Sequence, residues 1–348
     1  MADVYHMRVK DTTPLRSTEP WRVRASWWLR LIVAVVVLTC LVFAGRNHFD
    51  ELDRLVDIKP HMLAAIVAAF LAARWLNGQA MRQALRRLGF TIGLLESFML
   101  VILMNYTNLL IPRVGLGAPA VYLKAKHGVS YTQFATLLLP LGLLAMTAAG
   151  VIGLICQAAL WLSRPEPWDI WVAAIFTVAA AVGMAALFAR LPMLGWWPRR
   201  LRDWADHANE SWRALGGRAS FVRSILVLHV AIFLLRAGRM YLVFTALGVE
   251  VNFLGLFIAS LLADLMMLIS ITPAGLGFRE AALLYSAQIL GTTESVALSA
   301  AILDRAVWTV GVIVIAQFGL WRMVRPAKST GGDDVTNGGA AEVDAARR

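Results

Sequence analysis

Several ionisable side chains stand inside long apolar runs of this chain, where a charge is costly. Five of them lie deep within such runs: Arg236, Arg239, Asp264, Asp304 and Arg305. An ionisable side chain at the centre of a bilayer costs about 2.5–3.5 kcal/mol on insertion scales, so each of these residues suggests a functional role. Arg236 and Arg239 lie about one helical turn apart and therefore share a face of one helix.

Two Pro-Gly breaks interrupt apolar runs and are each accompanied by a basic residue. The first has the sequence PRVGLG and the second has the sequence PAGLGFRE. The breaks are defined by six residues: Pro112, Gly115 and Gly117 in the first, and Pro273, Gly275 and Gly277 in the second. Irregular backbone at membrane depth is tolerated where it faces protein or water, so both breaks are expected to face the protein interior.

The breaks and the buried arginines together predict an anion site. Backbone N–H groups at the start of a helix favour anions. Adding Arg113, Arg236 and Arg279 gives a cavity suited to a phosphate-type head group. Glu280 follows the second break directly, and it either caps its own helix or pairs with an arginine.

A second interpretation of the intramembrane charges is also open. They could form a buried ion-pair network that only holds helices together, with Asp264 or Asp304 paired to Arg236 or Arg239. Such pairs are themselves weak evidence for a site, because buried charges are usually paired.

Other polar and sulfur-containing residues have simpler explanations. Arg74 is near a cytoplasmic helix end, and its long side chain is expected to extend to the membrane surface. Asn105 and Asn108 precede the first break and are expected to satisfy its freed backbone groups. Cys40 and Cys156 lie in apolar runs and are expected to be small core residues without a disulfide.

No arrangement for catalysis or metal binding can be recognised. The six histidines show no metal-ligand spacing such as H-E-x-x-H, and no Ser/His/Asp or Cys/His arrangement is present. The sequence therefore predicts no cofactor, no metal and no enzymatic activity.

The composition is that of a polytopic membrane protein. Hydrophobic residues make up 59% and charged residues 16% of the chain, whereas a soluble domain carries about 25% charged residues. The formal net charge is +11. The bases stand in short clusters between apolar runs, where they act as topology signals, so nucleic-acid binding is not predicted.

The apolar runs predict an all-α protein with a single transmembrane domain over residues 27–325. Full spans are expected at 27–44, 61–79, 131–162, 169–189, 224–247 and 295–321, and two broken elements at 94–123 and 251–291. Residues 1–26 and 329–348 are expected to be tails. Residues 196–216 alternate Arg with Trp and Leu at helical spacing, which predicts a cytoplasmic amphipathic linker helix.

Charge distribution predicts how these elements are oriented. The positive-inside rule places the loops at Arg86 and Arg199, and the C-terminal Arg322, in the cytoplasm. Both termini are then cytoplasmic, the first broken element is a hairpin entering from the cytoplasm, and the second is a hairpin entering from outside. The chain becomes an inverted repeat of span, span, hairpin and span, with halves 27–162 and 169–325. Inverted repeats with broken elements meeting near the midplane are typical of secondary transporters.

The two breaks and their surroundings resemble a known family. The first signature comprises Asn105, Leu109, Pro112, Arg113 and Gly115, followed by YLK at 122–124 and GVS at 128–130. The second is a P-x-G-x-G-x-x-E pattern at 273–280. The sequence resembles the transmembrane region of lysyl-phosphatidylglycerol synthases and their stand-alone, flippase-like relatives. The chain is expected to be a stand-alone member, without the aminoacyl-transferase domain of the full-length synthases.

The resemblance implies movement of a lipid between leaflets of the cytoplasmic membrane. An anionic or polyprenyl-type lipid is the expected substrate, with its head group held by Arg113, Arg236 and Arg279. One alternative is an accessory protein that binds a lipid, a lipid-modifying enzyme or a glycosyltransferase without transporting. Another is an intramembrane transferase, which the missing nucleophile–base pair disfavours.

Overall fold

The computed structural model describes residues 58–110, 116–163, 169–188, 219–269 and 278–324. All regular structure in these ranges is helical. The helices are α3 (Pro60–Arg87), α4 (Leu94–Leu110), α5 (Gly117–His127), α6 (Tyr131–Ser163), α7 (Ile170–Phe188), α9 (Ala219–Ala246), α10 (Phe253–Ile269), α11 (Phe278–Tyr285), α12 (Ala287–Leu290) and α13 (Glu294–Val324). The expected first span, both tails and the linker helix lie outside the described residues.

Local sequence explains where several helices begin and end. The helix α6 starts with a capping box, in which Ser130 and Gln133 exchange backbone-to-side-chain hydrogen bonds of 3.0 and 3.1 Å. The Asp169 carboxylate accepts bonds from two backbone N–H groups in the first turn of α7. The helix α5 ends at Gly128, whose φ of +71° is easily adopted only by glycine.

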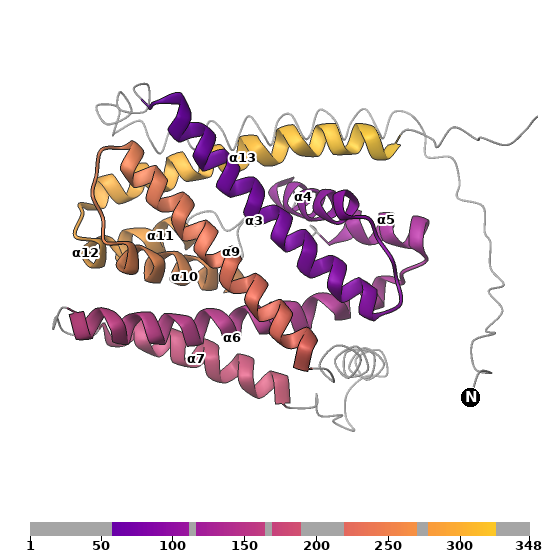
Figure 1. Ribbon diagram of the computed structural model, residues 1–348, viewed down its shortest axis with the longest axis horizontal. Helices are drawn as coiled ribbons and strands as arrows, with labels where there is room; N and C mark the ends of the chain where they lie inside the picture. Colours follow the sequence, from indigo (N-terminus) through magenta and orange to yellow (C-terminus); the bar gives the residue numbers. More distant parts are fainter. Residues whose placement is uncertain (1–57, 111–115, 164–168, 189–218, 270–277, 325–348) are drawn as a thin grey trace, which may run out of the picture.

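The helices form an interlocked bundle (Figure 1). The helices α6 and α7 lie side by side on one flank, and α13 lies on the opposite flank. The helices α3 and α9 pack against each other and run obliquely between the flanks. In Figure 1, α4 and α5 lie on one side of this pair, and α10 and α11 lie on the other. Residues far apart in the sequence therefore meet in the middle of the bundle.

The pairs of helices in contact follow a regular pattern. The helix α3 contacts α4, and α9 contacts α10; α4 contacts α13, and α10 contacts α6. Likewise α5 contacts both α4 and α6, while α11 contacts both α10 and α13. Exchanging α3 with α9, α4 with α10, α5 with α11 and α6 with α13 converts each of these contacts into another one that is present.

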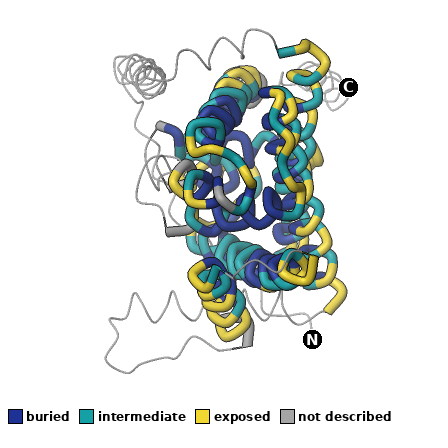
Figure 2. The backbone as a smooth tube through the Cα atoms, turned by 90° about the vertical axis from the view of Figure 1, so that its left-hand side faces the viewer, coloured by how far each residue is buried: buried dark blue, intermediate teal, exposed yellow. Residues whose placement is uncertain are grey.

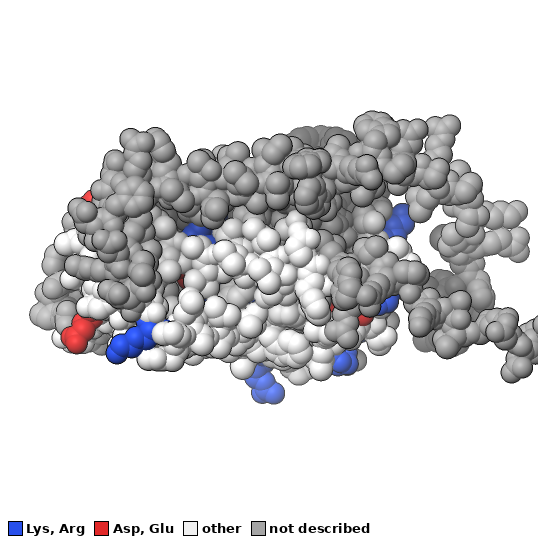
Figure 3. Space-filling view, turned by 90° about the horizontal axis from the view of Figure 1, so that it is seen from above, with Lys and Arg blue, Asp and Glu red and all other residues white. Residues whose placement is uncertain are grey.

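Apolar surface faces outward over much of the bundle. Figure 2 shows buried residues along the inner faces of the helices and exposed residues outside. In Figure 3 an uncharged band occupies the middle of the described surface. Four described helices, α3, α6, α9 and α13, are long and apolar enough to cross a membrane, and α4, α7 and α10 are shorter apolar helices.

The long helix α6 combines a close contact with an interrupted backbone. A side chain at Gly150 would collide with the backbone of Phe176 and Ala180, so glycine lets α7 approach α6 closely. Pro140 lies inside α6 and is buried. Because proline has no N–H, the backbone hydrogen bond from residue 140 to the preceding turn is missing.

The predicted helices agree with the observed ones in position, with differences at their ends. The second predicted span extends to Arg87, because no breaker occurs between residue 79 and the Leu88-Gly89 turn. The second arm of the broken element predicted at 94–123 extends to His127. The second arm of the broken element predicted at 251–291 is divided into α11 and α12. The breaks at Pro112, Gly115, Pro273, Gly275 and Gly277 lie outside the described residues, while Gly117 begins α5.

Candidate functional site

A cavity of about 390 Å³ lies in the middle of the bundle, among α3, α4, α6, α9, α10 and α13. Most of its wall is apolar, including Met81, Met104, Leu141 and Phe233. Its polar wall contains Arg74, Asn77, Asn105, His229, Arg236, Arg239, Asp264 and Arg305. The structure thus brings four of the predicted residues, Arg236, Arg239, Asp264 and Arg305, to one cavity.

Arg236 and Asp264 form an ion pair on the cavity wall. The Arg236 Nη1 atom donates a hydrogen bond of 2.8 Å to Asp264 Oδ2, which joins α9 to α10. Their side chains keep 22% and 13% of their surface exposed. Since Asp264 is the only ionisable residue in α10, its charge depends on a partner from another helix.

Arg239 and Asp304 form a second pair, one turn along α9, that joins α9 to α13. The distance from Arg239 Nη2 to Asp304 Oδ1 is 3.0 Å, and the side chains are only 4% and 1% exposed. The Arg239 guanidinium also lies 5.8 Å from the centre of the Phe70 ring, within the range of a cation–π contact. Both pairings are among those that the structural interpretation of the sequence allowed.

The remaining predicted site residues differ in their location relative to the cavity. The Arg305 guanidinium lies 5.2 Å from the centre of the Trp308 ring, and both residues line the cavity. Arg279 and Glu280 are in the first turn of α11, and their side chains are outside the described part of the structure. Arg113 also lies outside the described residues.

Arg74 belongs to the cavity, which the sequence interpretation did not predict. Its Nη1 atom donates a 3.3 Å hydrogen bond to Asn105 Oδ1, and its guanidinium lies 5.5 Å from the centre of the Phe70 ring. The expectation that Arg74 extends to the membrane surface is therefore wrong. Asn105 likewise faces the cavity, and its amide donates to the Val101 carbonyl within α4.

A sequence signal for Arg74 existed. FLAAR, which ends at Arg74, and FLLR, which ends at Arg236, stand at nearly equal distances before the two Pro-Gly breaks. In the structure these arginines lie on α3 and α9, which pack against each other, and both line the same cavity. The similarity of the two segments was a better guide than the position of Arg74 along its helix.

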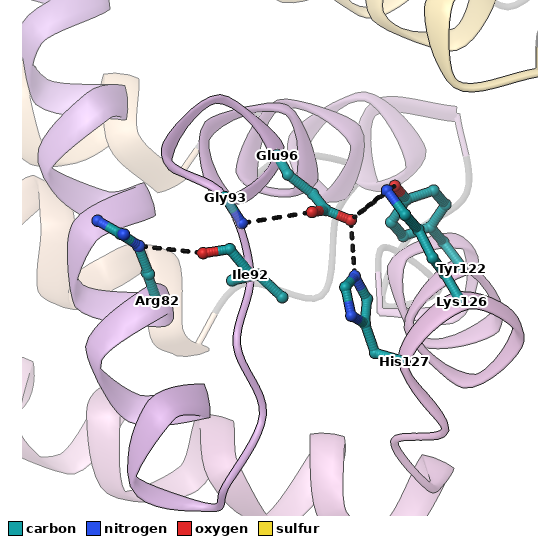
Figure 4. Close-up of polar contacts among 7 residues, drawn as sticks. All are labelled: Arg82, Ile92, Gly93, Glu96, Tyr122, Lys126 and His127. Carbon is teal, nitrogen blue, oxygen red and sulfur yellow. Dashed lines mark hydrogen bonds and ion pairs between the residues drawn. The ribbon is translucent and has the colours of Figure 1, made fainter. Parts of the chain in front are cut away.

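A second polar cluster, unnoticed in the sequence, joins α4 to α5 (Figure 4). Glu96 Oε1 accepts hydrogen bonds from Tyr122 Oη at 2.7 Å and Lys126 Nζ at 3.0 Å, and lies 2.7 Å from His127 Nε2. The backbone N–H of Gly93 also points to Glu96 Oε2, at 3.4 Å. We refer to Glu96, Tyr122, Lys126 and His127 as the Glu96 cluster.

The Glu96 cluster holds a carboxylate in its charged form. Glu96 stands in the first turn of α4, which is not one of the four spanning helices. Burial raises the pKa of Glu96, but hydrogen bonds from His127, Tyr122 and Lys126 outweigh burial and lower the pKa to about 2. The signal in the sequence was weak, because Glu96 and the other members of the cluster stand on opposite sides of the first break.

The chemistry of the cavity follows from the side chains that line it. Among the described residues, no group of three His, Cys, Asp or Glu side chains is placed to hold a metal ion. The cavity instead combines guanidinium groups with an apolar wall. Guanidinium is planar and donates paired hydrogen bonds to carboxylate and phosphate groups, so its chemistry is that of anion binding.

Apolar helices long enough to cross a bilayer, enclosing a cavity lined by arginine, define a multi-pass membrane protein with an internal polar site. The sequence matches the family described as the lysylphosphatidylglycerol synthase TM region over residues 27–316. The chain therefore belongs to this family.

A second similarity covers a shorter part of the chain. A UPF0104 membrane protein of Methanothermobacter thermautotrophicus is 35% identical over 83 residues. This alignment covers 24% of the present chain and 25% of the archaeal protein. No solved structure matches the chain.

Proposed function

We propose that this protein moves an anionic or polyprenyl-type lipid between the leaflets of the cytoplasmic membrane. The observation that carries the proposal is the arginine-lined cavity inside a bundle of apolar helices. A lipid head group that crosses a bilayer needs a polar environment on its way, while its acyl chains remain stable in the hydrocarbon. The cavity supplies guanidinium groups for a phosphate, and the proposed process makes and breaks no covalent bond.

The pattern of helix contacts supports an inverted repeat. The exchange of α3, α4, α5 and α6 with α9, α10, α11 and α13 preserves their contacts, as expected if the two sets are equivalent halves. Under this proposal α4–α5 and α10–α11 are the two hairpins, entering from the cytoplasm and from outside. Rocking of the halves would then expose the cavity to each leaflet in turn.

The role proposed for Arg236 follows from its position. It is the arginine that is partly exposed on the cavity wall and paired with a carboxylate also on the wall. Arg74 and Arg239 flank Phe70 nearby. In this proposal Arg236 contacts the phosphate, while Arg305 and Arg239 contribute positive potential; Arg113, Arg279 and Glu280 act from the breaks.

Reconstitution into liposomes tests the proposal. Purified protein is incorporated into phosphatidylcholine vesicles containing labelled phosphatidylglycerol or a labelled polyprenyl phosphate, and head-group accessibility is followed with a membrane-impermeant quencher. Wild type is expected to move at least one of these lipids faster than protein-free vesicles, and Arg236→Gln is expected to slow movement at least tenfold. Movement no faster than in protein-free vesicles, for every lipid tried, would contradict the transport proposal.

The same vesicles separate transport from simple lipid binding. An accessory protein would bind a labelled lipid and still leave its distribution between leaflets unchanged. The ion pairing of Arg236 to Asp264 is the observation that favours this second candidate, because a paired arginine can be purely structural. Binding without movement would assign the protein to the accessory class.

A further inference from the structure

We propose that Asp264 is an internal counter-ion that occupies, in the lipid-free protein, the place on Arg236 that the lipid phosphate takes. The phosphate would have to displace Asp264 to bind, and the return of Asp264 would help to release it. This inference rests on the proposed function, because it assigns a regulatory role to a residue of the same cavity.

The difference between the two ion pairs on α9 carries the argument. Arg236 and Asp264 both line the cavity and keep part of their surface exposed. Asp304, in contrast, is 1% exposed and is not part of the cavity wall. A ligand in the cavity can therefore reach the Arg236–Asp264 pair directly, whereas Asp304 lies behind its arginine.

Chemistry makes the carboxylate a close substitute for a phosphate. The same guanidinium N–H groups that bond carboxylate oxygens bond phosphate oxygens, with similar lengths. The 2.8 Å bond from Arg236 Nη1 to Asp264 Oδ2 uses one of these donors. An incoming phosphate thus competes with Asp264 for hydrogen bonds and also meets its negative charge.

Competition of this kind suits a site that must release what it binds. A passage site must attract its ligand enough for entry and hold it weakly enough for exit. An arginine alone in an apolar cavity would hold an anion tightly, since little water screens the charge. A carboxylate that returns to Arg236 replaces the departing phosphate, so neither charge is left unpaired in the bundle.

Equilibrium binding to the full chain tests the inference. The protein is placed in phosphatidylcholine nanodiscs, and binding of fluorescently labelled phosphatidylglycerol is measured for wild type, Asp264→Asn, Asp264→Glu and Arg236→Gln. Asp264→Asn is expected to lower the Kd at least fivefold, because asparagine retains the size and loses the charge. Asp264→Glu is expected to stay near wild type, and Arg236→Gln to weaken binding.

Asp304→Asn is the matched control for charge. It removes one carboxylate of α13 that is not part of the cavity wall and leaves Arg236 and Asp264 in place, so its Kd is expected to fall less than that of Asp264→Asn. Equal tightening by Asp304→Asn and Asp264→Asn would overturn the inference, because a general gain of positive charge would then explain both. Inorganic phosphate is expected not to displace the labelled lipid; displacement at micromolar concentrations would assign the site to a soluble phosphate and overturn the lipid part.

The outcomes distinguish this inference from the proposed function. If wild type binds the lipid and Arg236→Gln weakens it, but Asp264→Asn binds equally or more weakly, Asp264 orients Arg236 and the inference fails alone. If no variant binds any anionic lipid, the proposed function fails. Should Asp264→Asn not fold, Arg236→Gln is compared with Arg236→Gln/Asp264→Asn. The two are expected to differ less than fivefold in Kd, because Asp264 acts through Arg236; a double variant that binds at least fivefold more tightly would contradict the inference, since charge alone would then explain the effect.

Discussion

The Glu96 cluster and the Arg239–Asp304 pair use the same kinds of charge in different surroundings. In the Glu96 cluster one carboxylate receives several donors from α5, and Lys126 is 54% exposed to solvent. In the Arg239–Asp304 pair two charges face each other in the bundle, with at most 4% of either side chain exposed. Water can replace a lost partner in the first region and cannot in the second.

The comparison indicates that the surroundings of a charged group, more than its number of hydrogen bonds, determine how much stability is lost when its partner is removed. Breaking a buried pair leaves an uncompensated charge, whereas an exposed ion pair contributes little. The cavity pair Arg236–Asp264 lies between these cases, partly exposed but enclosed by the bundle. This intermediate exposure is the reason why we propose that Arg236 exchanges Asp264 for a lipid phosphate.

The largest effect is expected from the buried pair. Asp304→Leu leaves the Arg239 charge without its carboxylate and is expected to destabilise the fold by about 3–5 kcal/mol. Equilibrium unfolding in mixed micelles, titrated with sodium dodecyl sulfate, measures the loss. The double variant Arg239→Met/Asp304→Leu is expected to recover most of it; no recovery would show that something other than the unpaired charge is responsible.

A smaller effect is expected at the Glu96 cluster. Glu96→Gln removes the negative charge that Tyr122 and Lys126 bond, and is expected to cost about 1–3 kcal/mol. The same unfolding titration applies, with Glu96→Asp as a variant that keeps the charge and shortens the reach. A loss equal to that of Asp304→Leu would remove the distinction between the two regions.

The smallest mutational effect is expected at the exposed end of the cluster. Lys126→Ala is expected to change the free energy of unfolding by less than about 1 kcal/mol, because the ammonium group is largely solvated. This difference in the free energy of unfolding should shrink further in 1 M salt, where the Debye length is about 3 Å and interactions between exposed charges are strongly screened. An effect that is large and independent of salt would mean that Lys126 is part of a desolvated network.

Acid should weaken the Glu96 cluster over a defined range. The pKa of Glu96 is lowered from 4.5 to about 2 in the folded protein, so its contribution to stability is complete above about pH 4.5 and is lost as the pH falls toward 2. Unfolding of wild type and Glu96→Gln, compared at pH 6 and pH 3, isolates this contribution. The gap between them should narrow at pH 3; a gap that widens would reverse the assigned sign.

Much of the fold could be predicted from the sequence because hydrophobic runs and breakers act locally. The long helix α6 was predicted almost to its end, since Ser130 starts it and the prolines after Ser163 exclude its continuation. The choice between Asp264 and Asp304 as partner of Arg236 could not be made. It depends on which helices pack on α9, and periodicity within one run contains no such information.

The site was predicted in part for the same reason. Arg236, Arg239, Asp264 and Arg305 were recognised because a charge is conspicuous in an apolar run, whatever its partners are. The location of Arg74 was predicted wrongly because its position near a predicted helix end was given more weight than the similarity of its segment to the segment that ends at Arg236. The Glu96 cluster was missed because Glu96 belongs to α4, whereas its three partners belong to α5. Contacts between two helices cannot be read from the periodicity of either one.

The part of the cavity wall formed by α6 differs in stiffness from the part formed by α9. Leu138, Leu141 and Gly142 line the cavity on either side of Pro140 in α6. One backbone bond is already absent at this turn, so flexing α6 here costs less than flexing a fully bonded helix. The α9 side, in contrast, is braced by ion pairs to two neighbouring helices. The cavity wall is therefore stiffer on the α9 side and more flexible on the α6 side. A change in the width of the cavity requires the least energy when α6 bends.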